Sequence, residues 1–322
     1  MRSQKQKTEQ NVKKQQDDPP LSRTDDLPLP LQPVENMSRK TFKRFSEFIR
    51  GELGIKMPDV KRTMLQARLQ KRLRKLGMNT FDDYYDYVFS PQGMAGELAN
   101  MIDVVTTNKT DFFREPKHFD YLSQVVLPRF VKKHRIGAVS RSREPGPGLQ
   151  RVFKLWSVGC SSGEEPYSLA MALSDFGTSH PGFTYTILAT DISVEMLKKA
   201  KLGIYDHERV EPVPMRFRKK YLLKSRDKDK RLVRVVPELR ATVHFQRINL
   251  AKGEFAIQGA MDVIFFRNVL IYFGRATQEL VLNRLCQYLK PDGHMFLGHS
   301  ETLSGLNVPL ASLTTAVYMR SK

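Results

Sequence analysis

From residue 152 onward, segments with the residue pattern of β-strands alternate with segments of helical periodicity, and this alternation restricts the fold more than any other feature. Strands and helices in this order form a mostly parallel, doubly wound α/β sheet with helices on both faces. The expected strands lie within residues 152–158, 184–190, 242–248, 261–273, 294–299 and 314–321, and the expected helices within 164–177, 193–203 and 277–290.

The N-terminal part of the chain has a different pattern. Residues 1–37 are polar and lack hydrophobic periodicity, so we expect a disordered tail there. Helical spacing over residues 38–105 predicts a small all-helical domain, and residues 106–322 form the α/β domain. We expect two interruptions of the latter, a flexible basic loop at 133–151 and a small inserted β-subdomain at 203–240. One expected helical face of the N-terminal domain contains Val60, Met64, Leu65, Leu69 and Leu73.

The chain has 53 Lys and Arg residues against 34 Asp and Glu residues, which gives a formal net charge of +19. This excess favours a polyanionic partner, and nucleic acid, a membrane surface and an acidic protein are the alternatives. No apolar run approaches the ~20 residues of a membrane span, and the first residues lack the apolar segment of a secretory signal. The two cysteines, Cys160 and Cys286, have no metal-binding spacing. We therefore expect a cytoplasmic protein without a metal site.

The turn after the first expected strand, residues 159–163 (GCSSG), fits two kinds of chemistry. As G-x-S-x-G it has the pattern of a hydrolase nucleophile elbow, and Ser161, Asp262 and His299 follow in the chain order of that catalytic triad. As a glycine loop before a helix it is the first turn of a nucleotide-type cofactor site. The two glutamates directly after the turn disfavour the hydrolase, because carboxylates at that helix N-terminus oppose an oxyanion.

The cofactor interpretation points to a ligand without phosphates. The spacing of Gly159 and Gly163 matches neither the dinucleotide fingerprint nor the P-loop pattern. A cationic or zwitterionic ligand tolerates an acidic neighbour such as Glu165, whereas a pyrophosphate does not. Asp191 ends the second expected strand, where an acidic side chain either binds ribose hydroxyls or caps the next helix. A ribose, an adenine, a sulfonium and no phosphate describe S-adenosylmethionine.

Six motifs, four long and two short, then occur in a specific order. They are TTNKTDFFREP, WSVGCSSGEEPYSLAM, ATDISVEMLKKAKLGIYD, INL, FFRNVLIYF and a final GHSE. Over about residues 38–320 the chain resembles the chemotaxis receptor methyltransferases, the CheR-type protein-glutamate O-methyltransferases. The resemblance implies a Rossmann-like S-adenosylmethionine-dependent methyltransferase domain, an all-α N-terminal domain and an inserted β-subdomain. It also implies methyl transfer to glutamate side chains of chemoreceptors, with S-adenosylhomocysteine as the second product.

The resemblance assigns the site residues one by one. Arg114 and Tyr272 would orient the incoming carboxylate, which is already ionised at neutral pH, so no general base is required. Glu165 would bind the amino-acid end or the ribose side of the cofactor. Asp191 would bind the ribose, and Asn249 and Leu250 would lie beside the adenine. The full set of expected cofactor contacts is Asn108, Thr110, Arg114, Glu165, Asp191, Asn249, Leu250, Asn268 and Val269.

The positive charge then has an expected partner, the acidic helical cytoplasmic region of a membrane chemoreceptor. We expect a basic helix in the N-terminal domain to steer the enzyme, as a monomer, onto that region. The glycine-free tip of the inserted subdomain leaves open whether a receptor peptide is tethered there. The alternatives are a nucleic-acid methyltransferase, whose [DNS]-P-P-[YFW] motif is absent, and a non-catalytic adaptor. The expected docking residues are Arg62, Arg68, Lys71, Arg72 and Lys75.

Overall fold

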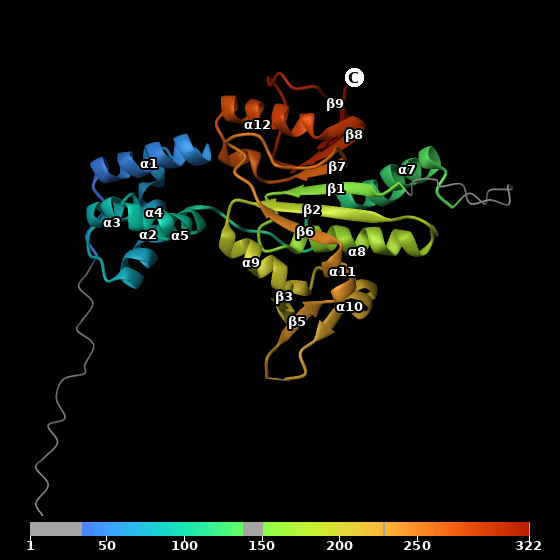
Figure 1. Cartoon of the computed structure of the whole chain (residues 1–322), viewed down its shortest axis with the longest axis horizontal. Helices are drawn as coiled ribbons and strands as arrows, with labels where there is room; N and C mark the ends of the chain where they lie inside the picture. The colour runs from blue at the N-terminus through green and yellow to red at the C-terminus, as the bar shows by residue number, and fades with distance from the viewer. Residues whose placement is uncertain (1–33, 138–150, 228, 322) are drawn as a thin grey trace, which may run out of the picture. The chain divides into compact units, whose positions relative to one another are not determined.

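The computed structural model describes residues 34–137, 151–227 and 229–321 of the 322-residue chain (Figure 1). The expected tail at 1–37 therefore lies outside the described residues except for 34–37. The expected basic loop at 133–151 also lies outside them, except for 133–137 and 151. Throughout these described ranges, every helix is too short or too polar to cross a lipid bilayer.

Residues 39–105 form a series of helices whose ends follow local capping signals. Ser38 begins the first helix, because its Oγ accepts a hydrogen bond from the Thr41 backbone N–H at 3.0 Å. Gly54 ends it with φ of 70°, a conformation that glycine adopts without strain. Apolar side chains at helical spacing form one core. The helices are α1 (Arg39–Leu53), α2 (Arg62–Leu76), α3 (Phe81–Val88), α4 (Pro91–Ala95) and α5 (Glu97–Val105).

The predicted apolar face of α2 is wrong at one position. Val60 is 89% exposed, because it lies in a 3-10 turn, η1 (Asp59–Lys61), that precedes α2. A 3-10 turn has about three residues per turn, so α-helical spacing does not extend backward through it. Leu65, Leu69 and Leu73 are fully buried, as expected.

A seven-stranded sheet forms the centre of the α/β part, with the order β6-β2-β1-β7-β8-β10-β9. The first five strands in this order are parallel, and β10 pairs antiparallel with both β8 and β9. This arrangement confirms the mostly parallel sheet expected from the sequence. The strands are β1 (Phe153–Val158), β2 (Tyr185–Asp191), β6 (Val243–Arg247), β7 (Met261–Phe266), β8 (Leu289–Leu297), β9 (Leu310–Thr314) and β10 (Val317–Arg320).

Helices cover both faces of the sheet, because alternate side chains of the central strands face opposite sides. In β1, Leu155 belongs to the core that includes α8, whereas Trp156 belongs to the core that includes α12. Figure 1 shows the strands between these two helices. The remaining elements include a π-helical turn, η2, and a 3-10 turn, η4. They are α6 (Lys117–Tyr121), η2 (Leu122–Val126), α7 (Leu127–His134), α8 (Glu164–Thr178), α9 (Val194–Leu202), η4 (Leu270–Tyr272) and α12 (Arg275–Gln287).

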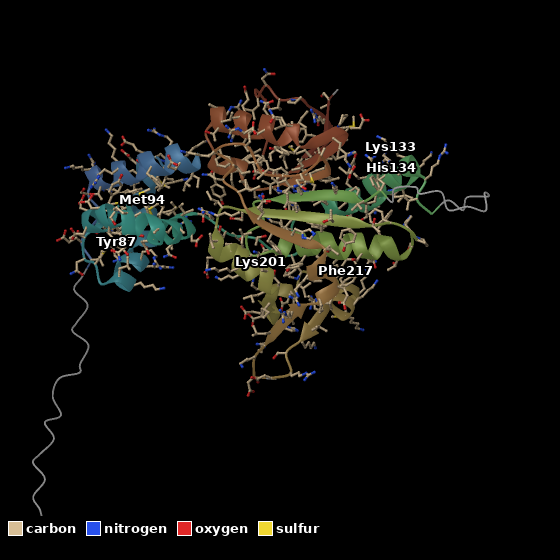
Figure 2. The ribbon with its side chains drawn as sticks, in the orientation of Figure 1. Tyr87, Met94, Lys133, His134, Lys201 and Phe217 are labelled. Carbon is tan, nitrogen blue, oxygen red and sulfur yellow. The ribbon has the colours of Figure 1, made fainter. Side chains whose placement is uncertain are left out.

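The segment between α9 and β6 forms a second, antiparallel sheet of three strands in the order β3-β5-β4. It also contains helix α10, so it is larger than a single hairpin. Phe217 of α10, labelled in Figure 2, is buried and stacks on Phe113 with ring centroids 5.5 Å apart. The elements of this inserted subdomain are β3 (Ile204–Asp206), η3 (His207–Val210), α10 (Met215–Tyr221), β4 (Leu222–Lys224), β5 (Leu232–Val235) and α11 (Pro237–Ala241).

Candidate active site

A cavity lies at the carboxyl edge of the parallel strands, where the chain leaves β1, β2, β6 and β7. The strand order changes direction at β1, since β2 lies on one side of it and β7 on the other, and ligands of doubly wound sheets bind at such a switch point. The structure brings all of the predicted cofactor and methyl-transfer residues to this cavity. Its lining includes Asn108, Thr110, Arg114, Glu165, Asp191, Asn249, Leu250, Asn268, Val269 and Tyr272.

The helical part of the chain also contributes to the cavity wall, which the sequence analysis did not predict. Arg68 of α2 lines the cavity, together with apolar residues before and within that helix. A hydrogen bond from the Asn249 Nδ2 to the Glu52 backbone oxygen, at 2.8 Å, connects the end of β6 with α1. The residues contributed from this side are Leu53, Ile55, Met57, Lys61, Met64 and Arg68.

The glycine turn after β1 adopts a backbone conformation that depends on its small residues. Gly159 has φ of 73°, and a Cβ atom there would lie 2.6 Å from the Val269 Cγ2. Gly163 has φ of 98°, and its Cβ would lie 2.8 Å from the Tyr205 hydroxyl. The turn is therefore held close to both neighbouring segments, and it leaves the Ser161 backbone N–H directed at Asp191.

Asp191 has the environment that a ribose diol requires. Its Oδ2 accepts the Ser161 backbone N–H at 2.8 Å, and its Oδ1 accepts the Ser193 backbone N–H at 2.9 Å. Burial raises the pKa of the Asp191 carboxyl, although these N–H donors act in the opposite direction. Each carboxylate oxygen retains further acceptor capacity, and Asp191 lines the cavity, so it can accept hydroxyl donors from a ligand there. The residues present thus fit an adenosyl ligand.

Glu165 forms an ion pair with an arginine that the sequence analysis missed. Arg267 Nε lies 2.7 Å from Glu165 Oε2, and the Ser157 hydroxyl donates to Glu165 Oε1 at 2.7 Å. The Arg267 side chain is only 1% exposed. A charged residue inside the apolar run MDVIFFRNVLIYF was the available signal, because a buried guanidinium requires an acidic partner.

Arg267 also organises the segment that carries Arg114. Its Nη1 donates to the Arg114 backbone oxygen at 2.6 Å and to the His118 Nδ1 at 3.2 Å, and lies 3.4 Å from the Glu115 carboxylate. Burial, together with the Arg267 charge, lowers the pKa of His118 to about 4, so this imidazole is neutral. Glu115, His118 and His299 lie close enough to share a metal ion, but the guanidinium occupies the position beside Glu115 and His118. Arg267 and Glu115 form an ion pair in this cluster, and the neutral His118 accepts a hydrogen bond from the same guanidinium.

Asn268 and Val269 reach the cavity on a turn that Glu301 holds in place. Asn268 has φ of 60°, which is uncommon for a residue with a side chain. The Glu301 carboxylate accepts backbone N–H groups of Asn268 at 2.8 Å, Leu270 at 2.7 Å and Gly298 at 2.6 Å. Three donors on one buried carboxylate stabilise the strained turn, so the GHSE motif acts on the site through Glu301.

The hydrolase triad is not assembled. The Ser161 hydroxyl donates to the Asn108 backbone oxygen at 2.9 Å. Asp262 lies at the start of β7, at the opposite edge of the sheet, where Lys290 Nζ approaches it at 2.6 Å. Since parallel strands begin at one edge and end at the other, no rotamer change brings Ser161 and Asp262 together.

The predicted docking residues on α2 do not share one open surface. Arg72 binds Glu97 through two hydrogen bonds of 2.7 and 2.6 Å, and its side chain is 13% exposed. Arg68 donates to Thr107 Oγ1 at 2.8 Å and to the backbone oxygens of Val105 and Thr106. These two arginines thus bind this chain itself, and their role in docking a receptor stays a prediction. Arg62 is half-buried, whereas Lys71, Arg74 and Lys75 are exposed.

Comparisons with known proteins agree with this geometry. Residues 40–106 match the family model described as CheR methyltransferase, all-alpha domain. Residues 108–319 match the model described as CheR methyltransferase, SAM binding domain. The chemotaxis protein methyltransferase of Escherichia coli is 38% identical over 286 residues, which cover 89% of this chain and 92% of that protein.

Two further relatives carry the same name. That of Klebsiella aerogenes is 39% identical over 271 residues, covering 84% of this chain and 86% of that protein. That of Borreliella burgdorferi is 34% identical over 287 residues, which cover 89% of this chain and 96% of that protein. These matches extend over both the helical and the α/β parts, and they confirm the resemblance drawn from the motifs. The chain belongs to the CheR methyltransferase family, and S-adenosylmethionine is its methyl donor.

Proposed function

We propose that this protein methylates glutamate side chains in the acidic, helical cytoplasmic region of a membrane chemoreceptor, acting in the cytoplasm as a monomer. The products are glutamyl methyl esters and S-adenosylhomocysteine, and the output is chemosensory adaptation. The observation that carries the proposal is the cavity at the carboxyl edge of the sheet, where the family's expected contact residues converge in a chain whose relatives are named chemotaxis protein methyltransferases.

In this proposal Asp191 holds the ribose hydroxyls, while Asn249, Leu250 and the neighbouring Ile248 form the adenine side. The Asn249 side-chain amide already donates to the Glu52 backbone oxygen and accepts the Ala251 backbone N–H at 3.0 Å. Asn249 therefore contributes to the adenine side mainly by shaping the cavity wall. Asn108, Thr110 and Glu165 face the remaining part of the ligand, and Asn268 and Val269 close the cavity from the β7 side. The Arg267–Glu165 pair lowers the local negative charge without removing an acceptor for a cationic group.

When bound, S-adenosylmethionine would supply the methyl group, whose bond to sulfur would break as the bond to the glutamate oxygen forms, with S-adenosylhomocysteine as the leaving product. The acceptor carboxylate has an unperturbed pKa of about 4.3 and is ionised at neutral pH, so no proton has to move. Arg114 and Tyr272 both line the cavity and are half-buried, where they orient the carboxylate by charge-assisted and hydroxyl hydrogen bonds. Binding of the acceptor carboxylate in this cavity would remove water from the nucleophile and align the reacting atoms.

The exposed basic residues of α2, Lys71, Arg74 and Lys75, then attract the acidic receptor helix. Nucleic acid is the less favoured acceptor despite the net charge of +19, because the segment after β7 reads RNVLIYF in place of the proline-containing motif of amino-methylating nucleic-acid enzymes.

The test is incubation with tritiated S-adenosylmethionine and a membrane fraction that contains chemoreceptors. We expect label on the receptor band, and we expect mild base to release it as methanol. Methyl esters hydrolyse in mild base, whereas methylated amines do not. Receptor with its acceptor glutamates changed to alanine is the matched control. Base-stable label, or label on added nucleic acid in place of receptor, would contradict the proposal.

A further inference from the structure

The inserted subdomain contacts both chain segments that carry predicted cofactor residues on the β1 side of the cavity. The Tyr205 hydroxyl donates to the Ser162 backbone oxygen at 2.8 Å, inside the glycine turn. The Tyr205 ring also packs edge-on against Phe112 of the 108–114 segment, with centroids 4.9 Å apart. Phe217 stacks on Phe113 of the same segment. The subdomain is therefore part of the support of the cofactor site.

Arg209, in η3 of the subdomain, connects these two segments by itself. Its Nη2 donates to the Thr110 backbone oxygen at 3.1 Å and forms a short ion pair with the Glu164 Oε1. Thr110 lines the cavity, and Glu164 is the first residue of α8, directly after the glycine turn. One guanidinium thus bridges the 108–114 segment and the start of α8.

Glu164 requires this partner because it is buried. Its side chain is 1% exposed, and its other carboxylate oxygen accepts the Ser162 hydroxyl at 2.6 Å. Loss of the guanidinium would leave a buried carboxylate without a cation. Such a charge draws in water and shifts its neighbours, and here the neighbours are the turn and the 108–114 segment.

We propose that Arg209 is a positioning residue for S-adenosylmethionine, acting through Glu164 and Thr110. Neither Arg209 nor Glu164 is among the residues that line the cavity, so the effect on the cofactor is indirect. The Arg209 side chain is 45% exposed, so its removal leaves no large cavity in the core. The proposal rests on cofactor binding by this chain and does not depend on the identity of the methyl acceptor.

The test measures binding of S-adenosylhomocysteine by calorimetry to the full chain, with Arg209→Ala, Arg209→Lys and the double variant Arg209→Ala/Glu164→Gln. We expect Arg209→Ala to raise the Kd roughly 10-fold, with less than a twofold change in kcat at saturating S-adenosylmethionine. Arg209→Lys should retain most of the affinity. The double variant should recover much of it, because the uncompensated charge is gone.

Arg231→Ala is the matched control. Arg231 also belongs to the subdomain and pairs with Glu208 at 3.4 Å, but both side chains are more than 70% exposed, at 72% and 74%. Its Kd should equal that of the unchanged protein. An Arg209→Ala Kd within twofold of the unchanged protein would overturn the proposal. The proposal would also be overturned if Arg209→Ala lost affinity, the double variant with Glu164→Gln did not regain it, and the Tm of both variants were lower than that of the unchanged protein. Because the Kd measurement needs no receptor, it stays valid even if receptor methylation, and with it the kcat, is not observed.

Discussion

Arg267 and Glu165 form a buried ion pair, with the guanidinium Nε 2.7 Å from the carboxylate Oε2, across 102 residues of sequence. Arg267 follows the end of β7 and Glu165 lies in the first turn of α8, so the pair connects β7 with the helix that follows β1. The same guanidinium holds the Arg114 backbone oxygen. One side chain therefore connects three segments of the cavity wall.

Changing Arg267 to Ala should lower the free energy of unfolding by about 3 kcal/mol, because it leaves Glu165 charged and buried without its partner. Urea denaturation followed by circular dichroism measures the effect. The double variant Arg267→Met/Glu165→Gln is the control, and it should recover a large part of the loss. Equal losses for the single and double variants would show that packing, and not the ion pair, determines stability here.

Changing Tyr272 to Phe should lower kcat for receptor methylation roughly 10-fold, the effect of one hydrogen bond to a charged group. The KM for S-adenosylmethionine should stay the same, because the hydroxyl is proposed to contact the acceptor carboxylate. Steady-state kinetics with saturating receptor separates the two constants. Arg114→Ala should lower turnover further, and normal turnover with normal cofactor affinity would remove Arg114 from the mechanism.

Reversing the charges of Lys71, Arg74 and Lys75 together to Glu should raise the KM for receptor roughly 10-fold at low salt, and the difference should shrink as salt rises. Calorimetry with S-adenosylhomocysteine should show unchanged affinity. The control variant reverses Lys117, Lys132 and Lys133 to Glu, so its net charge changes by the same amount. These lysines are exposed on α6 and α7, and Figure 2 labels Lys133. An equal rise in KM for both variants would attribute steering to overall charge and not to α2.

Acid should destabilise the protein through its buried histidines. Burial lowers the pKa of His294 from 6.5 to about 4, and His294 is 8% exposed. Between these two pH values the unfolded chain binds a proton that the folded chain does not, so stability falls as the pH falls from 6.5 toward 4. This pKa shift of His294 lowers the free energy of unfolding by about 3 kcal/mol once the pH has fallen to about 4.

The variant His294→Phe isolates this contribution, because it removes a titrating group far from the cavity whose Nε2 lies buried without a hydrogen-bond partner. Urea unfolding at a series of pH values should show that the free energy of unfolding falls less steeply with acid in the variant. A smaller fall should remain, because the pKa of His118 is also lowered to about 4. Identical slopes for the two proteins would contradict the shifted pKa of His294.

The sequence by itself determined the parts of this protein that depend on local pattern and on strand polarity. Alternating strand and helix segments specify a parallel sheet, and parallel strands end at the same edge. Asp191 ends a strand and Asn249 and Asn268 each follow one, so they lie at that edge and line one cavity. Capping signals such as Ser38 and Gly54 determined helix ends in the same local way.

The tertiary structure alone decided which long-range partner each charged side chain has. Helical spacing indicates that Arg68 and Arg72 share a stretch of α2 with Lys71 and Lys75, but it contains no information about what packs on that stretch. Arg72 pairs with Glu97 and Arg68 donates to the 105–107 segment, whereas Lys71 and Lys75 stay exposed. Arg267 and Arg209 were missed for the same reason. Their partners are distant in sequence, and only the packed chain brings opposite charges into the low-dielectric positions where they must pair.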